Sequence, residues 1–418
     1  MGRRFVPIVI VLAVMAFAVA AAALARVPDQ SRLWSAAVGL IVLGGITPLI
    51  YAVNVRIVPV FSRRQWQHPA TIYTALSAGV AGGWLVFLGR ALPEVEIERT
   101  GHALALIGGI LFVASLIRLF RSEPTTNVAP PLPYPEQATV DQLAITFTRM
   151  SGMYLLVGLS VGLALEYWRP TQGRWDLVWA HTLLLGWFLQ MASGVCYHVL
   201  SRWTGEQWRS VKRIRWHLQT VTLGLPLMVA ALAFDLDRLF MVAGPLQAIA
   251  LTLFVWNIWP LVAKLPALSR LGMSIAACYL VFGVSIGASA AIDPANHVLL
   301  RFSHATINLL GWTGLLICAV GYYLFPRLVG QPLRWPRLAW AQIVIHASGV
   351  LLLATSWWWY LSQDRGARPL ITIGALLVAA GFLTFAGIMA GTFKAVFARS
   401  NAVVSGITIQ PRRPTKAR

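Results

Sequence analysis

Two histidines stand near the start of two long, closely similar apolar segments. His181 lies in residues 179–205 and His304 opens residues 304–330, and the two segments match at an offset of 125 residues. An ionisable side chain in an apolar segment is costly unless it binds a metal or is hydrogen-bonded, so such residues are candidates for function. Two histidines at corresponding places of a repeat favour shared metal ligands over two unrelated core residues. The coinciding residues are Ala180/Ala305, Leu184/Leu309, Leu185/Leu310, Gly186/Gly311, Trp187/Trp312, Val195/Val320, Tyr197/Tyr322, Arg202/Arg327 and Gly205/Gly330.

A fainter third copy of this segment occupies residues 37–60. Its Gly44 falls on the repeated glycine and its Pro59 on Pro326, but it contains no histidine. Three related segments predict a threefold internal architecture. We expect two of its three units to carry a ligand and the first to have none.

The other histidines are placed by their depth in the predicted helices, using a rise of ~1.5 Å per residue. His102 falls in the same layer as His181 and His304, near the outer ends of their spans, and His297 lies slightly above them. His102 is therefore a candidate third ligand. Taken singly, each histidine is explained as well by a core imidazole that donates to a helix carbonyl.

The positioning elements are transmembrane helices. Apolar residues make up 58% of the 418 residues and charged residues only 11%, with a mean hydropathy of +0.69. Runs of about 20 apolar residues can cross a bilayer as helices. The chain is therefore predicted to be an all-α polytopic membrane protein. The expected spans are 4–25, 35–60, 71–91, 100–120, 142–168, 177–202, 213–234, 239–263, 272–292, 297–325, 338–361 and 370–396.

The twelve spans are predicted to form one membrane domain, 1–418, built as three four-helix arcs. The arcs cover approximately 1–120, 142–263 and 272–397. A proline-rich segment, 121–141, is expected to be a cytoplasmic linker between the first two arcs, because proline-rich chain cannot continue a helix. Residues 398–418 form a basic cytoplasmic tail.

The formal net charge of +20 is explained by membrane topology, because the excess basic residues lie on one side of the membrane. Lys and Arg greatly outnumber Asp and Glu in the loops on the side of the N-terminus, whereas the two signs balance on the other side. By the positive-inside rule, both termini are predicted to lie on the cytoplasmic side of a bacterial inner membrane. The basic groups are expected to contact lipid headgroups, and no nucleic-acid partner is predicted.

The first apolar run and the cysteines each have an alternative interpretation. Arg3 and Arg4 precede a run that resembles a signal peptide, but its length and the twelve-span count favour a retained first helix. Cys196, Cys278 and Cys318 form no Cys-x-x-Cys pair, which argues against a disulfide, a zinc knuckle or covalently attached haem.

Other residues in the spans have structural interpretations. We expect Tyr197, Tyr322 and Tyr323 at the membrane boundary as interfacial aromatics, and Trp357, Trp358 and Trp359 in the opposite aromatic belt. No carboxylate is predicted deep in a span, which argues against a proton-coupled transporter.

The tenth span resembles subunit I of the haem-copper oxidases. The residues that carry the resemblance run from His304-Ala-Thr-Ile-Asn-Leu-Leu-Gly-Trp to Tyr-Tyr-Leu-Phe-Pro-Arg-Leu-Val-Gly. That family has twelve helices in three arcs. The chain is more similar to the NnrS-type branch of membrane proteins, which is associated with haem, copper and nitric-oxide stress. The segment Asn54-Val-Arg-Ile-Val-Pro-Val-Phe resembles a Gly-Arg-x-x-Pro-x-Phe segment of that branch.

The resemblance implies that His304 is the axial ligand of a haem. Thr306 stands where the family has a second histidine, and Ala37 and Gly39 stand where another haem ligand would be sought. The family's Pro-Glu-Val-Tyr does not follow His181. Only two of the six family histidines are therefore matched. Low-spin haem needs two axial ligands and the copper site needs three histidines, so a complete oxygen-reducing oxidase is excluded.

The expected site is a single b-type haem between the second and third arcs. His304 would be the proximal ligand, and His181 the opposing ligand or the ligand of a second metal, with copper the candidate. Arg365, Arg368 and Arg301 are expected to bind the haem propionates, although each alone is as well explained as a solvated loop charge.

The resulting functional prediction is a haem-binding and copper-binding membrane protein with a redox or nitric-oxide-related role. Its expected partners are the lipid bilayer and a redox protein or other membrane subunits. Two alternatives remain. A solute permease would have the same span count and internal repeats, and a non-catalytic assembly or sensing subunit would bind haem or metal without turnover.

Overall fold

The computed structural model describes residues 2–125, 132–362 and 365–398, and they form helices joined by short loops. Twelve helical spans in this part of the chain are long and apolar enough to cross a membrane, which confirms the predicted number. The first four spans are α1 (Gly2–Leu24), α2 (Arg32–Gly39) with η1 (Leu40–Ile46) and α3 (Thr47–Ser62), α4 (Pro69–Ala91) and α5 (Val95–Arg121). The next four are α6 (Gln137–Leu165), α7 (Trp175–His181) with η2 (Thr182–Leu189) and α8 (Gln190–Thr204), α9 (Val211–Ala233) and α10 (Asp237–Val262). The last four are α11 (Ala267–Ile292), α12 (Pro294–Thr306) with η3 (Ile307–Thr313) and α13 (Gly314–Val329), α14 (Pro336–Ser362) and α15 (Arg368–Ala398), which follows the short turn η4 (Arg365–Ala367).

The three repeated segments share a local departure from α-helix. Each contains a turn of π-helix, η1, η2 or η3, around its repeated glycine, Gly44, Gly186 or Gly311. A π-turn leaves carbonyls without their usual partner, and in η1 and η3 a threonine hydroxyl donates to the carbonyl five residues earlier, over 2.9 Å in both cases. Such turns recur at functional sites of helices. The faint first copy is therefore a structural repeat as well.

The repeated segments also end alike. Gly205 and Gly330 follow α8 and α13 with φ of +76° and +63°, the left-handed conformation that ends many helices. Arg63 holds the corresponding place after α3 with φ of 57°. The repeated glycines thus mark a helix end that the first copy reproduces without glycine.

The repeated spans are the most buried of the twelve. Hydrogen bonding joins two of them directly, because Trp187 Nε1 donates to Thr47 Oγ1 over 3.2 Å. The first repeated span, which contains η1, approaches α4 so closely that a Cβ at Gly83 of α4 would lie 2.2 Å from the main-chain nitrogen of Gly44. Glycine is required at this contact, since two helices can meet this closely only without side chains.

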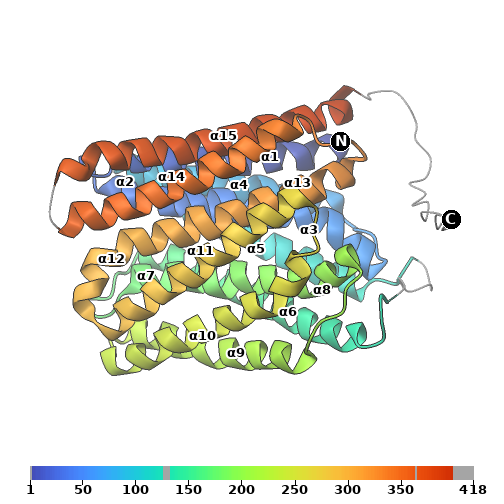
Figure 1. Ribbon diagram of the computed structural model, residues 1–418, viewed down its shortest axis with the longest axis horizontal. Helices are drawn as coiled ribbons and strands as arrows, with labels where there is room; N and C mark the ends of the chain where they lie inside the picture. The colour runs from blue at the N-terminus through green and yellow to red at the C-terminus, as the bar shows by residue number, and fades with distance from the viewer. Residues whose placement is uncertain (1, 126–131, 363–364, 399–418) are drawn as a thin grey trace.

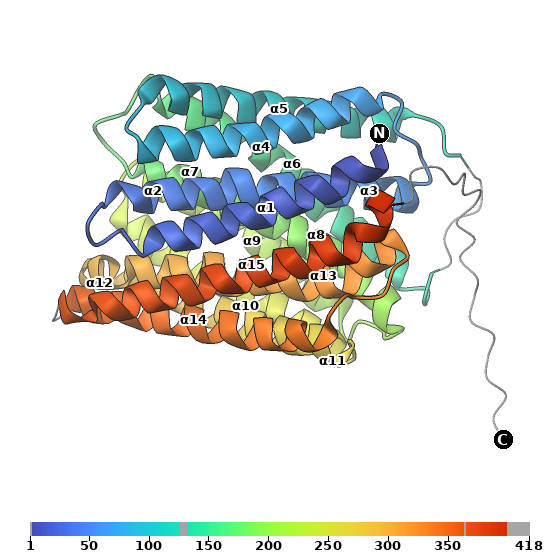
Figure 2. The same ribbon diagram turned by 90° about the horizontal axis from the view of Figure 1, so that it is seen from above.

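The remaining helices lie around these spans and run roughly along the same direction (Figure 1). Each packs against neighbours in the sequence, and α1 also packs against α15, which brings the first and last spans together (Figures 1 and 2). α1 begins and α15 ends at the same end of the bundle. We call this the terminal end, and the other the distal end.

The expected positions of three aromatic residues need correction. Tyr197, Tyr322 and Trp357 were expected at membrane interfaces, but all three side chains are buried in the protein. Trp358 and Trp359 are exposed, as an interfacial belt requires. Adjacent residues of a helix point in different directions, so Trp357 can face the protein interior while Trp358 and Trp359 face outward.

The linker is shorter than expected. α6 begins at Gln137 rather than near residue 142, because Tyr134 and Gln137 are bound to a later loop: Tyr134 Oη accepts from the main-chain nitrogen of Trp208 over 3.1 Å. Residues 126–131 of the linker, and 399–418 of the predicted tail, lie outside the described residues.

Candidate functional site

His181 and His304 occupy similar places on two of the repeated spans. His181 is the last residue of α7, directly before η2, and His304 lies on α12, three residues before η3. Both side chains are partly buried. Each Nδ1 lies 2.8 Å from a main-chain carbonyl oxygen, that of Leu177 for His181 and that of Gly283 for His304.

These hydrogen bonds define the protonation of both rings. A carbonyl oxygen can only accept, so Nδ1 carries the proton and donates in each case. The lone pair is then on Nε2, the atom left to bind a metal. Ligating histidines commonly donate their other ring nitrogen to a carbonyl, which fixes the ring and increases its basicity.

Glycines on α11 make room for His304. A Cβ at Gly287 would lie 2.5 Å from Cε1 of the ring, and a Cβ at Gly283 would lie 2.5 Å from Nδ2 of Asn308. Asn308 donates to the main-chain carbonyl of His304 over 2.8 Å. The ring is therefore held between α12 and α11 by packing and by hydrogen bonds.

The imidazoles of His181 and His304 interact electrostatically with each other, and His297 interacts with both. In the register of the repeat, however, His181 corresponds to Thr306, and His304 corresponds to Trp179. The expectation that the two histidines occupy equivalent positions is therefore wrong by two residues. Repeat symmetry therefore does not relate the two rings.

Unpartnered polar groups accompany these histidines. Among the described residues, the buried hydroxyls of Thr182 and Thr306 have no hydrogen-bond partner. Thr182 follows His181, and Thr306 lies two residues after His304. Buried polar atoms are usually satisfied, so groups without a partner need an explanation such as a ligand or water.

The arginines expected to bind propionates have other contacts. The guanidinium of Arg368 forms an ion pair with Asp29, and that of Arg301 lies 4.7 Å from the ring centroid of Phe302. The side chain of Arg365 lies outside the described residues. The role of these three arginines stays a prediction.

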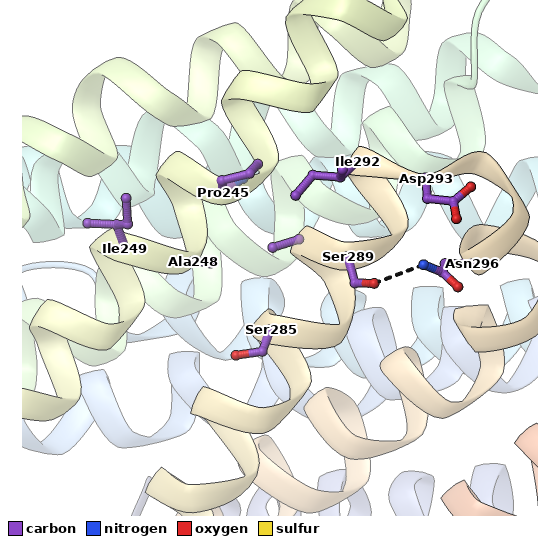
Figure 3. Close-up of a pocket in the computed structure, with 9 residues that line it drawn as sticks. Pro245, Ala248, Ile249, Ser285, Ser289, Ile292, Asp293 and Asn296 are labelled. Carbon is purple, nitrogen blue, oxygen red and sulfur yellow. Dashed lines mark hydrogen bonds between the residues drawn. The ribbon is translucent and has the colours of Figure 1, made fainter.

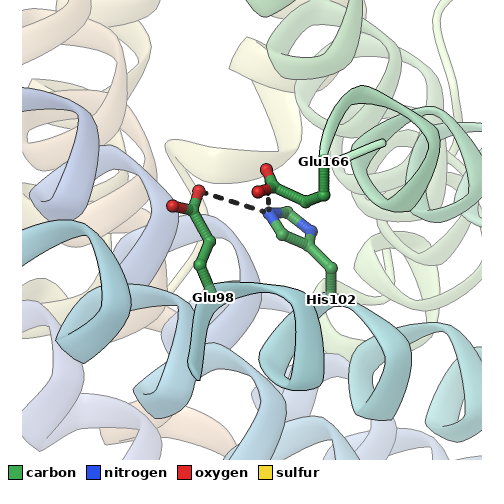
Figure 4. A group of neighbouring side chains, drawn as sticks. All are labelled: Glu98, His102 and Glu166. Carbon is green, nitrogen blue, oxygen red and sulfur yellow. Dashed lines mark ion pairs between the residues drawn. The ribbon is translucent and has the colours of Figure 1, made fainter. Parts of the chain in front are cut away.

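His102 belongs to a separate polar cluster at the distal end, in which it lies beside Glu98 and Glu166 (Figure 4). Together with Arg90, which contacts Glu98 and His102, these residues form what we call the Glu98–Glu166 cluster. His102 is 1% exposed, and its Nε2 lies 3.9 Å from Glu98 Oε1 and 3.7 Å from Glu166 Oε1. Arg90 Nη2 lies 3.3 Å from the same Nε2 and Arg90 Nε lies 2.6 Å from Glu98 Oε1. Because His102 Nε2 accepts from Arg90, its lone pair is not left for a metal in this arrangement.

Glu166 has unusual electrostatics for a carboxyl at a helix end. Burial, followed by the negative charge of Glu98, raises the pKa of Glu166 to about 7. Glu98 could have been found from sequence, since it lies four residues before His102 on one helix face. Glu166 could not, because only packing of α5 against α6 brings it there.

Tyr197 forms the centre of a second buried network towards the terminal end. Its hydroxyl lies 2.9 Å from Nδ1 of His217 and accepts from Nδ2 of Asn257 over 3.2 Å. Its repeat partner Tyr322 donates to Oε1 of Gln342 over 2.9 Å. Both repeated tyrosines therefore join central spans to their neighbours through side-chain hydrogen bonds.

Replacing Tyr197 by Phe is expected to destabilise the protein by about 1–3 kcal/mol, because buried polar groups of His217 and Asn257 lose their common partner. Thermal unfolding in detergent measures the effect. Tyr323→Phe, at a partly buried neighbour of Tyr322, serves as the control and should change stability by less than about 0.5 kcal/mol. Equal melting temperatures for Tyr197→Phe and wild type would contradict this role.

A surface cavity of about 470 Å³ lies between α10 and α11 (Figure 3). Its lining is mostly apolar, and its polar wall includes Ser289, whose Oγ accepts from Asn296 Nδ2 over 3.1 Å. Neither His181 nor His304 lines this cavity. It is therefore distinct from the histidine pair.

No protein-family model matches the chain, and no curated protein sequence matches it significantly.

Proposed function

We propose that this chain is a membrane haem protein that holds one b-type haem through His304. The observation that supports this best is the histidine pair itself: two electrostatically interacting imidazoles on buried central spans, each with Nδ1 bound to a carbonyl and Nε2 left for a ligand. His181 would bind the opposite side of the haem iron or a second metal, for which copper is the candidate. When bound, the haem would supply one-electron redox chemistry and an iron site for a small gas such as nitric oxide.

The protein's own residues would then hold and orient the group. The Gly283 carbonyl fixes the ring of His304, and Gly287 leaves it space. The unpartnered hydroxyls of Thr182 and Thr306 are available to a ligand or to ordered water. Only His304 and His181 match positions of the six histidines that the haem-copper oxidases use, so the proposed role is redox or nitric-oxide related rather than complete oxygen reduction.

The proposed setting is a bacterial cytoplasmic membrane with the terminal end in the cytoplasm, as the distribution of basic residues predicts. The histidine pair then lies in the outer half of the bilayer. A redox protein or another membrane subunit would deliver electrons.

The absorption spectrum of the detergent-purified protein tests the proposal. We expect a Soret band in the oxidised protein and sharpened visible bands after reduction with dithionite. Cells should be supplied with haem precursor, and an empty-vector membrane preparation is the control. A folded protein without a Soret band, even after haem is added, would favour the permease alternative.

A further inference from the structure

The Glu98–Glu166 cluster contains two partly buried carboxylates but only one arginine to neutralise them. From α4 it receives Arg90, from α5 Glu98 and His102, and from the end of α6 Glu166. The side chains of Glu98 and Arg90 are each 14% exposed, and that of Glu166 is 6% exposed. Two partly buried carboxylates therefore face one partly buried guanidinium.

The other charged groups nearby do not change this balance. Arg169 interacts electrostatically with the cluster, but its side chain is 62% exposed and lies 3.9 Å from Asp176. Arg99 pairs with the exposed Glu96, and its Nε and Nη2 donate to the main-chain carbonyl of Glu166. From α7, Trp179 contributes only its ring, 5.3 Å from the guanidinium carbon of Arg90.

His102 adds no charge to the cluster. Arginine has no acceptor, so Nε2 of His102 must accept from Arg90, and the ring proton must lie on Nδ1. Nδ1 is buried and has no partner among the described residues. His102 is thus a neutral acceptor in this arrangement.

We propose that Glu98 and Glu166 hold one exchangeable proton between them, so that the Glu98–Glu166 cluster is a proton-binding site at the distal end. One carboxylate oxygen of each glutamate lies within 4.8 Å of the other's, and neither side chain is more than 14% exposed. Adjacent carboxyl groups in a poorly hydrated place share one proton because both cannot ionise at low cost. With that proton bound, the pair carries a single negative charge against the positive charge of Arg90.

A divalent cation is a poorer occupant of the same atoms. The ligand atoms of Glu98, His102 and Glu166 lie within 4.8 Å of one another, which is close enough for a metal site. The guanidinium of Arg90, however, already contacts Glu98 and His102. A cation would have to displace it or accept its repulsion.

Release of the proton to water at the distal end leaves two negative charges on the pair and one positive charge on Arg90. The pKa of Glu166, about 7, places this release near neutral pH. Because this pKa lies above the ordinary glutamate value of 4.5, folding takes up a proton between these pH values. Stability therefore falls as the pH rises through that window and changes no further above it.

Infrared difference spectroscopy of the purified full-length protein between pH 5 and pH 9 tests the site. The wild type should show the carbonyl band of a protonated carboxylic acid that disappears with a midpoint near 7. Glu166→Gln should abolish the band, because Glu98 pairs with Arg90 and stays ionised. Glu98→Gln should shift the midpoint of the band to lower pH, because the negative charge of Glu98 is one of the causes of the raised pKa of Glu166. Glu206→Gln, at a half-exposed glutamate that faces Lys264, should leave it unchanged.

Three results would overturn the proposal. One is a wild type without the band. Another is a band that keeps its full amplitude in Glu166→Gln, or its wild-type midpoint in Glu98→Gln, with folding checked by gel filtration. The third is saturable Zn²⁺ binding at one ion per chain that Glu98→Gln removes, which would make the cluster a cation site. All of these readouts are independent of haem.

Discussion

Replacing His304 by Ala should lower the haem content of the purified protein by about tenfold or more. Loss of a group that merely orients a metal ligand already costs roughly 10–100-fold in affinity, and loss of the ligand itself should cost at least as much. The Soret absorbance per protein measures the change. Imidazole added to the medium should restore part of the absorbance, because alanine leaves space where the ring was.

The histidine variants around His304 distinguish ligation from general damage. His297→Ala, on the same helix and in electrostatic contact with His304, should keep its haem. His181→Ala should lose haem if His181 is the opposing ligand, and should keep it while losing a second metal otherwise. Haem retained in full by both His304→Ala and His181→Ala would refute the assignment of the site.

Replacing Gly83 by Ala should destabilise the bundle by about 3 kcal/mol or more, at the upper end of the costs of overpacking. The added Cβ would lie 2.2 Å from the nitrogen and 2.3 Å from the Cα of Gly44. These are backbone atoms of a residue within η1, so no side chain can rotate away to relieve the overlap. Thermal unfolding monitored by gel filtration in detergent gives the size of the loss.

Gly152→Ala on α6 is the matched control, since a Cβ there meets nothing within 4 Å. Alanine is the better helix former by about 1 kcal/mol, so this variant should be unchanged or slightly more stable. If Gly83→Ala unfolded at the same temperature as Gly152→Ala, the close contact between α4 and η1 would be wrong.

The helices were largely predictable because membrane spans have a strong local signal. Apolar runs of sufficient length predicted the twelve spans. The start of α6, which differs from the prediction, depends on a tertiary contact. α6 begins early because Gln137 is bound: its Oε1 accepts from Tyr134 and from Trp208 Nε1. The π-turns were not predicted, although the repeated glycines mark their positions.

The site was predictable only in part because its contacts are tertiary. Sequence indicated His304 and His181 as candidates, but the partner of each Nδ1 depends on which carbonyl the folded chain places beside it. Sequence placed His102 in the same layer, yet packing gives it Arg90 and Glu166 as neighbours. Depth along a helix is readable from sequence, whereas the direction in which a side chain meets another helix is not.

The haem content of the wild-type protein tests the central claim most directly. Alkaline pyridine extraction gives the amount and type of haem, and amino-acid analysis of the same sample gives the amount of protein. We predict one b-type haem per chain, and nearly none in the His181→Ala/His304→Ala double variant. A folded wild type with a ratio near zero, or a double variant with an unchanged ratio, would contradict the account.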